Sequence, residues 1–191
     1  MESLTSGFQK QHGTSMIEVL VTIVILVIGL LGLAGLQSRL QVSEMESYQR
    51  AQALMLLNDM ASRITTNRTN AASYETGADT PLGAGMTCPT TSSTRQEIDT
   101  SEWCNELQGA AETSGTNTVG AMVGGRGCVE SLGSGQYLIT VAWQGLGPVS
   151  APPASVACGQ NEYDGAAGAS CINDLCRRVV TTIVRIATLS S

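Results

Sequence analysis

The apolar stretch from Met16 to Leu36 constrains this chain more than any other part of its sequence. It holds one charged residue, Glu18, and is otherwise almost entirely apolar or small. An α-helix over these residues spans roughly 30 Å at about 1.5 Å per residue, which matches the hydrocarbon core of a bilayer. No other stretch of the sequence is long and apolar enough to cross a membrane. We therefore predict one transmembrane helix over residues 16–36 and one modest soluble domain.

The charge of the chain argues against nucleic acid as a main partner. The net charge is −6 over 191 residues, and the ten Lys and Arg residues are scattered. Binding to phosphates needs a clustered basic surface, which this sequence lacks. Aromatic residues make up only 4 % of the chain, so the soluble core must rely on aliphatic side chains. A core this small benefits from covalent cross-links.

Six cysteines follow the apolar stretch, and none lies within it or before it. They are Cys88, Cys104, Cys128, Cys158, Cys171 and Cys176. An even number in an exported part favours disulfides in an oxidising compartment. Cys88 with Cys104 and Cys171 with Cys176 are plausible local pairs, although six cysteines allow about 15 connectivities. A metal site is the alternative, and the absence of a CxxC motif weakens it.

The polar segment before the apolar stretch has the features of a short leader. An ordinary secretory signal is cut after its apolar region, whereas the small residue Gly13 lies before it. A cut after Gly13 keeps the apolar stretch on the mature chain, which then begins with Thr14. This arrangement resembles the type IV pilin superfamily, in which a prepilin peptidase cuts after glycine and an acidic residue occupies the fifth mature position. Gly13 and Glu18 match that pattern, and Thr14 stands where the family usually has Phe.

The resemblance implies two further features at this end of the chain. The amino group of Thr14 would be N-methylated after cleavage. Glu18 would be buried among neighbouring helices and would pair with the N-terminal amine of an adjacent subunit, because an unpaired carboxylate in an apolar environment is costly. A carboxylate that simply stays at the membrane surface is the alternative.

Cleavage after Gly13 also removes several chemically important residues. The single Lys, His and Phe of the chain are Lys10, His12 and Phe8, and all precede Gly13. The mature chain would then lack a histidine base, a Schiff-base lysine and the commonest metal ligand. We therefore expect a protein that is not an enzyme and that needs no metal and no cofactor.

The helical pattern continues past the membrane segment. Four apolar residues recur at spacings of four, three and four and form one stripe: Ala53, Leu57, Met60 and Ile64. Two i,i+4 ion pairs with the acid first support a helix here: Glu46–Arg50 and Asp59–Arg63. We predict a helix from about Ser15 to Asn67, whose second half presses the stripe onto the soluble domain.

Three glycines interrupt the apolar helix at positions 29, 32 and 35. Each lowers helix propensity by about 1 kcal/mol relative to alanine. Close packing in the bilayer and local melting on entry into a filament both account for them.

Two stretches make the resemblance more specific. Residues 17–37, IEVLVTIVILVIGLLGLAGLQ, and residues 50–64, RAQALMLLNDMASRI, are similar to the minor pilins of the type IV pilus modification protein PilV family. The resemblance is close over residues 7–68. It returns weakly in GRGC at 125–128, in YLITVAWQG at 137–145 and in CRRVV at 176–180.

The remainder of the chain predicts loops, one short helix and a sheet. Residues 67–81 and 87–94 are expected to be loops, and residues 99–108 a helix with Asp99 as its N-cap. The acidic residues around this helix favour a solvated helix N-terminus over a pair of catalytic carboxylates: Glu97, Asp99, Glu102 and Glu106. Residues 124–127 predict a tight turn that leads into a strand at Cys128, since no P-loop lysine follows.

Residues 136–144 and 179–186 are the clearest strands, because apolar or β-branched residues dominate both. Residues 147–168 are predicted to be a proline- and glycine-rich excursion. Sequential strands with short links predict an antiparallel sheet, with residues 158–176 in a C-terminal loop stapled near its edge. The fold class is therefore α+β and pilin-like: a long N-terminal α-helix, transmembrane in its first half, packed on a C-terminal antiparallel β-sheet domain with disulfides. The expected division is a leader at 1–13, a helix at 14–68 and the sheet domain at 69–191.

The leading functional hypothesis is a minor pilin, a structural subunit that helps to initiate type IV pilus assembly. The resemblance implies partners among the other minor pilins, the major pilin and the prepilin peptidase, and a tip complex that often includes a large adhesin. It also implies the inner membrane before assembly, with the soluble domain in the periplasm, and the pilus afterwards. A type II secretion pseudopilin is the alternative within this class. A membrane-anchored periplasmic enzyme and a plain single-pass anchor protein are the alternatives outside it.

Overall fold

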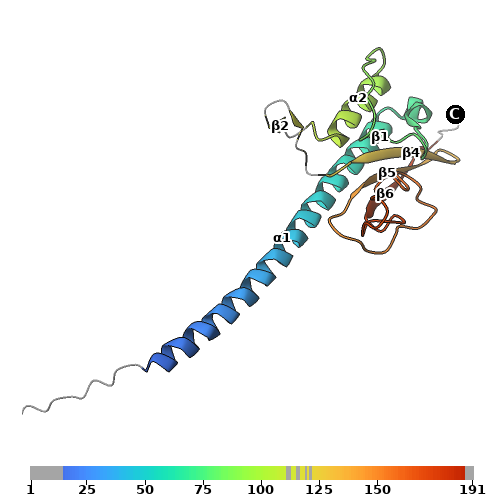
Figure 1. Ribbon diagram of the computed structural model, residues 1–191. Helices are drawn as coiled ribbons and strands as arrows, with labels where there is room; N and C mark the ends of the chain where they lie inside the picture. Colours follow the sequence, from blue (N-terminus) through green and yellow to red (C-terminus); the bar gives the residue numbers. More distant parts are fainter. Residues whose placement is uncertain (1–14, 111–112, 115–116, 119, 121, 188–191) are drawn as a thin grey trace, which may run out of the picture. The chain divides into compact units, whose positions relative to one another are not determined.

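The computed structural model describes residues 15–110, 113–114, 117–118, 120 and 122–187. The chain divides into two compact units between Ser43 and Glu44. Helix α1 runs from Met16 to Thr66, so it begins in the first unit and ends in the second (Figure 1). The helix predicted from Ser15 to Asn67 is therefore confirmed to within one residue at each end.

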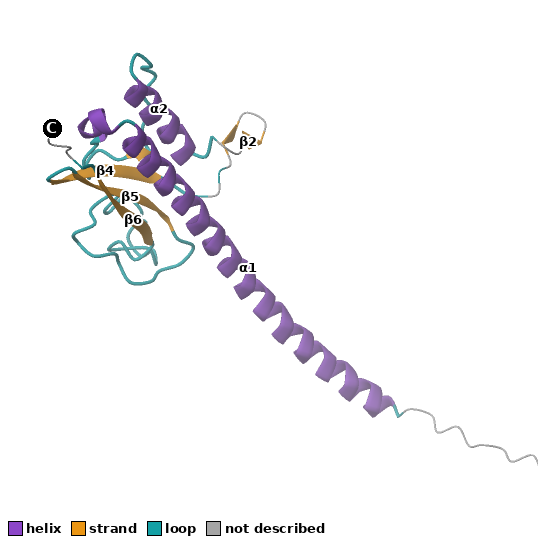
Figure 2. Cartoon of the chain, turned by 180° about the vertical axis from the view of Figure 1, so that it is seen from behind, coloured by secondary structure: helices purple, strands orange, loops and turns teal. Residues whose placement is uncertain are grey.

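The second unit adds short helices and a sheet to the C-terminal part of α1. A 3₁₀ helix, η1, spans Arg68–Tyr74, and helix α2 spans Arg95–Leu107. The strands are β1 at Leu82–Gly83, β2 at Thr113–Ser114, β3 at Asn117–Thr118, β4 at Arg126–Gly133, β5 at Gln136–Gln144 and β6 at Arg177–Arg185. Figure 2 shows α2 beside the C-terminal part of α1, with the main sheet next to them.

The main sheet has four antiparallel strands in the order β1-β4-β5-β6, and β2 pairs with β3 in a separate hairpin. Strands β4 and β5 are joined by Ser134 and Gly135, whose φ angles of 51° and 71° suit a two-residue hairpin turn. The strand predicted at residues 136–144 is confirmed with the same bounds. The predicted C-terminal strand is confirmed and begins two residues earlier, at Arg177.

One face of the sheet packs against α1 and α2. The predicted α1 stripe is confirmed, because Ala53, Leu57, Met60 and Ile64 are all buried in one cluster with β5 residues such as Ile139 and Val141. Trp103 of α2 is 0 % exposed, and its Nε1 donates a hydrogen bond to the carbonyl oxygen of Leu56 at 3.0 Å. Its ring occupies the space where a side chain at Gly127 of β4 would lie. The indole therefore joins both helices to the sheet.

The opposite face of the sheet is covered by the long segment between β5 and β6, residues 145–176. Thr140 and Ala142 point to this face and are fully buried beneath it, and the backbone oxygen of Thr140 lies 3.9 Å from Cys158 Sγ. The expectation of short links is therefore wrong for β5 and β6, which are joined through the proline- and glycine-rich excursion predicted at residues 147–168. A sheet with both faces covered buries more of a small core than a sheet exposed on one face.

Arginines hold this covering segment in place. Arg177 is 1 % exposed, and its Nη1 donates to the carbonyl oxygens of Val156 at 2.6 Å and Cys158 at 3.1 Å. Arg126 lies over the ring of Tyr163, 5.0 Å from its centroid, while the Tyr163 hydroxyl donates to Gly124. The GRGC and CRRVV sequences therefore supply the residues that attach residues 145–176 to the sheet.

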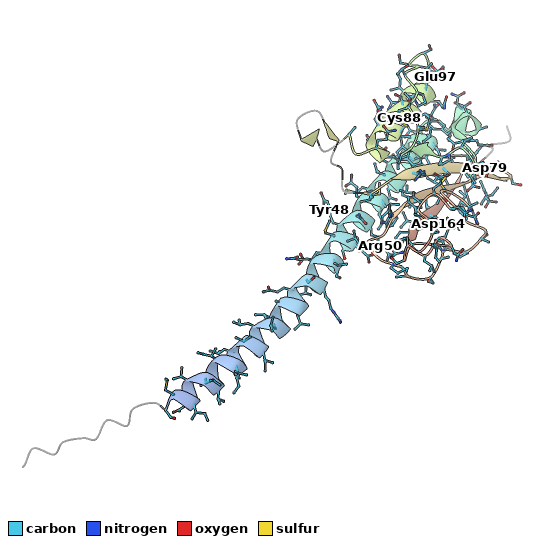
Figure 3. All side chains as sticks on the ribbon, viewed as in Figure 1. Tyr48, Arg50, Asp79, Cys88, Glu97 and Asp164 are labelled. Atoms are coloured by element: carbon cyan, nitrogen blue, oxygen red, sulfur yellow. A yellow bond between two sulfur atoms is a disulfide. The ribbon has the colours of Figure 1, made fainter. Side chains whose placement is uncertain are left out.

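Disulfides are confirmed in the second unit. The structure joins Cys88 to Cys104, Cys128 to Cys158, and Cys171 to Cys176, and no cysteine is free. The first and third are the two local pairs considered from the sequence. Figure 3 shows Cys88 beside α2, where its bridge ties the preceding loop to that helix. The second bridge connects β4 with the covering segment, so this segment is stapled across the face of the sheet as well as at its edge.

Two local predictions are wrong. Residues 67–81 do not form a loop throughout, because η1 occupies the first part and buries Ala71 and Tyr74. Helix α2 begins four residues before the predicted N-cap at Asp99. Thr94 caps it instead, with a capping box in which Thr94 Oγ1 accepts from Glu97 N and Glu97 accepts from Thr94 N.

The contact between Trp103 and β4 predicts a large effect from a small substitution. Gly127→Ala places a methyl group within the Trp103 ring, so we expect the free energy of unfolding to fall by about 1–3 kcal/mol. Gly147→Ala is the matched control, since nothing lies within 4 Å of its added carbon. Chemical denaturation of the two variants tests this. Equal stability for both would show that the ring does not need this glycine.

Candidate functional site

The first turn of α1 presents an acidic side chain at the start of an apolar helix. The carbonyl oxygen of Ser15 accepts hydrogen bonds from the backbone N–H groups of Glu18 at 2.9 Å and Val19 at 3.3 Å. Glu18 is exposed in this turn, where a carboxylate is favoured by the positive end of the helix dipole. Gly13 and Thr14, the residues of the predicted cleavage site, lie outside the described residues.

The side chains of residues 16–36 are exposed on all sides of the helix. Leu20, Leu26 and Leu30 are each more than half exposed, and Figure 3 shows the side chains spread around this part of α1. Among the described residues, α1 is the one helix that is long and apolar enough to cross a membrane. A helix that is apolar all round needs an apolar surrounding, which either lipid or neighbouring helices supply.

The three glycines of this segment have no packing role within the chain. A carbon added at Gly29, Gly32 or Gly35 would meet nothing within 4 Å, and the helix runs through all three without a break. Their reason must therefore lie in contacts with other molecules or in backbone flexibility. Both explanations from the sequence remain open.

The comparison with known families bears on this same segment. Residues 8–34 match the family described as "Prokaryotic N-terminal methylation motif". The match includes Gly13, Thr14 and Glu18 and extends through most of the apolar stretch. It supports a type IV pilin-like protein, a class processed by a prepilin peptidase and assembled with other pilins. Searches of curated proteins and of solved structures found no match to the chain.

The methylation motif and the fold agree with each other. The motif marks the start of a helix whose first part is apolar all round, and the same helix ends against an antiparallel sheet with three disulfides. This is a pilin-like α+β architecture. The motif covers residues 8–34 alone and does not distinguish one kind of pilin-like protein from another.

A cluster of charges around Arg63 fixes α2 on α1. The guanidinium contacts four carboxylates, at 2.6 Å from Asp59, 3.1 Å from Asp99, 2.5 Å from Glu102 and 3.5 Å from Glu106. The ion pair predicted between Asp59 and Arg63 is therefore confirmed. Burial opposes the charged form of Arg63, but hydrogen bonds to Glu102 and Asp59 raise its pKa above the ordinary arginine value.

The interpretation of these acids as a solvated helix N-terminus is wrong for most of them. Asp99 is 1 % exposed and receives hydrogen bonds from the Tyr74 hydroxyl at 2.5 Å and from Arg63. Burial and the bond to Asp99 raise the pKa of Tyr74 to about 12. Burial also raises the pKa of Glu106, and the nearby Asp59 raises it further. Glu97 alone has the expected role, as part of the capping box.

The spacing of the acidic residues in α2 predicts this cluster when both helices are considered together. Asp99, Glu102 and Glu106 are spaced three and four apart, so they share one face of α2. A row of acids on one helix face needs a cation on the element that packs against it. Arg63 is that cation, while the guanidinium of Arg95 adds a second contact to Asp99 at 2.9 Å.

The other predicted helix ion pair has a different partner. Glu46 pairs with Arg178 of β6 at 3.3 Å instead of with Arg50, and it also accepts from the backbone N–H of Leu146. Arg178 donates further to the carbonyl oxygen of Gly147 at 2.7 Å. Within the described ranges, no group of three His, Cys, Asp or Glu side chains is arranged to hold a metal ion.

The Arg63 cluster predicts an unequal response of two arginines on α1. Arg63→Met leaves the buried Asp99 with less compensation, and we expect a loss of about 3 kcal/mol in the free energy of unfolding. Arg50→Met is the control, because Arg50 is exposed and should change stability by less than about 0.5 kcal/mol. Thermal unfolding of the purified protein measures both. Similar melting temperatures for the two variants would refute the structural role of the cluster.

Proposed function

We propose that this chain is a minor pilin, a non-catalytic structural subunit that helps to initiate type IV pilus assembly as part of a priming complex at the tip. The carrying observation is the methylation motif at residues 8–34 on a helix that is apolar on all sides. The resemblance to the PilV family supports the minor-pilin role, because it continues through residues 50–64 into the part of α1 that packs on the sheet.

The proposed route of the protein follows from its two units. The apolar half of α1 would hold the chain in the inner membrane as a single-pass protein, with the second unit in the periplasm. Three disulfides in that unit support an oxidising compartment. After assembly the apolar half would exchange lipid for the helices of other pilins, and the subunit would become part of the extracellular pilus.

The proposed processing step divides the chain at Gly13. Residues 1–13 form the leader, residues 14–68 the assembly helix and residues 69–191 the sheet domain. The prepilin peptidase would cut between Gly13 and Thr14, and the new amino group of Thr14 would be methylated. These assignments are supported by the motif match, which spans the proposed cleavage site.

Glu18 has a proposed role in setting the register between subunits. It lies four residues after Thr14 and is exposed in the first turn of α1, so it is available to a neighbouring helix. A carboxylate that leaves water for an apolar bundle needs a positive partner, and the N-terminal amine of a neighbouring subunit provides one. Pairing of this kind favours a single axial offset between adjacent helices.

The cleavage assignment makes a direct prediction. Gly13→Ala should leave most of the protein in the membrane at its full length, because the prepilin peptidase of the family cuts after glycine. Gly7→Ala is the control, since it alters another leader glycine and should be processed normally. Intact-mass measurement of membrane extracts shows whether each variant has lost its first thirteen residues. A processed Gly13→Ala protein, or a wild-type protein that keeps its first thirteen residues, would contradict the assignment.

The register role makes a separate prediction. Glu18→Ala should be processed normally but should enter sheared pili roughly tenfold less, since the loss of a charge-assisted bond costs about 1.5–3 kcal/mol. Glu44→Ala serves as the control because it removes an exposed acid farther along the same helix. Quantitative immunoblots of pili and membranes give the ratio. Unchanged incorporation of Glu18→Ala would remove the pairing role.

The pseudopilin alternative shares the motif, the glutamate and the helix. Deletion of the gene separates the two, because loss of a minor pilin reduces surface pili while loss of a pseudopilin blocks protein secretion. A membrane-anchored enzyme is the alternative outside this class, and the disulfides exclude the cysteines as its nucleophile, since every cysteine of the described residues is in one.

A further inference from the structure

The two edges of the main sheet differ in how far their backbone groups are hydrogen-bonded. At the β4 edge, Leu82 and Gly83 of β1 pair with the first residues of β4. Beyond β1, the backbone N–H groups of Thr76 and Gly77 donate to the carbonyl oxygen of Val129 at 2.9 and 3.2 Å. The N–H of Val129 donates in turn to Thr76 Oγ1. This edge is therefore largely closed by the chain itself.

The β6 edge is open. Ile186 N donates to Gly135 O, and Cys176 O accepts from Gly145 N, so the even-numbered residues of β6 face β5. The odd-numbered residues Thr181, Ile183 and Arg185 must then turn their backbone N–H and C=O groups away from the sheet. All three are exposed, and within the part of the chain that the structure describes no group bonds to these backbone atoms.

The composition of β6 offers little protection against pairing. Native edge strands are commonly protected by lysine, by proline or by a bulge. Strand β6 contains no lysine and no proline, and its arginines lie at its two ends. Its pairing with β5 is regular, and six consecutive uncharged residues from Val179 to Val184 are apolar or β-branched. Ile183 is 49 % exposed beside the open backbone groups. Such a strand is a template for an additional strand.

A second copy of the chain is a poor occupant of this edge. Its own β4 edge is largely closed, so β6 is the edge of the main sheet that a second copy could offer within the described residues. Antiparallel pairing of two β6 strands places a two-fold axis perpendicular to the sheet, which reverses the direction of α1 residues 44–66 in the second copy. Residues 44–66 of the two copies would then run in opposite directions, whereas subunits of the proposed filament share one orientation.

The charges of β6 indicate which kind of segment could pair with this edge. Of the three arginines in β6, Arg177 pairs with Asp174 and Arg178 pairs with Glu46. Arg185 at the other end is exposed and has no carboxylate within ion-pair distance among the described residues. We propose that the β6 edge accepts an extended segment of a different subunit of the same assembly, with apolar residues along Thr181–Ile183 and a carboxylate opposite Arg185. This inference rests on the proposed role as a pilus subunit.

A backbone substitution tests the inference separately from the side chain. Ile183→Pro removes an outward N–H and leaves the β5–β6 bonds in place, whereas Ile183→Ala removes the side chain and keeps the N–H. We expect incorporation into sheared pili to fall roughly tenfold for Ile183→Pro and less than about twofold for Ile183→Ala. Equal incorporation of the two variants would overturn the proposal. Melting temperatures of the purified full-length proteins show whether each variant folds.

Two measurements keep the test decisive if the proline variant is unstable. Arg185→Glu should lower incorporation while Arg185→Gln should have a smaller effect, and equal values would contradict the charge match. A photo-crosslinking residue at 181 should join the protein to one other subunit of the purified pilus complex, and a residue at exposed Leu132 should not. A crosslinked homodimer, or no crosslink, would overturn the proposal. Absence of the wild-type protein from pili would instead refute the proposed function.

Discussion

One helix has to satisfy two environments, and the rest of the structure depends on that constraint. From Met16 to Leu36, α1 is apolar all round and exposed, so this part needs lipid or other helices for stability. From Gln49 to Ile64, the same helix buries a single stripe against a sheet. The first part of α1 is apolar around its whole circumference, as suits a helix surrounded by other molecules. The second part is apolar along one face, as suits a helix that packs on its own domain.

The attachment of α2 to α1 uses two kinds of interaction in parallel. Trp103 fills the space left by Gly127 and bonds to the α1 backbone, while Arg63 gathers acids from both helices. The chain is poor in aromatic residues, so a single indole contributes much of the contact between three elements. The charge cluster then fixes the direction of α2, which apolar packing alone leaves free.

The sequence predicts features that depend on neighbouring residues better than features that depend on partners distant in the chain. The α1 stripe, strand β5 and the Asp59–Arg63 pair follow from local spacing, and the structure confirms them. Asp99 was misplaced because its role depends on Arg63 and Tyr74, which are far away in sequence. Proline and glycine predict the loop between β5 and β6, but they do not show that it covers a face of the sheet, because this depends on contacts with strands distant in the sequence. Gly13 and Thr14 remain predictions, because they lie outside the described residues.

The bridge between Cys128 and Cys158 has a mechanical consequence. In the proposed filament the chain would be under tension, and a chain segment that detaches under load lengthens by about 3.4 Å per residue. The chain between these cysteines, whose sequence separation is 30, would extend to roughly 100 Å if it were released. Because the bond joins Cys128 of β4 directly to Cys158, tension passes through the disulfide, and the part of β4 after Cys128, β5 and the first part of the covering segment are not extended.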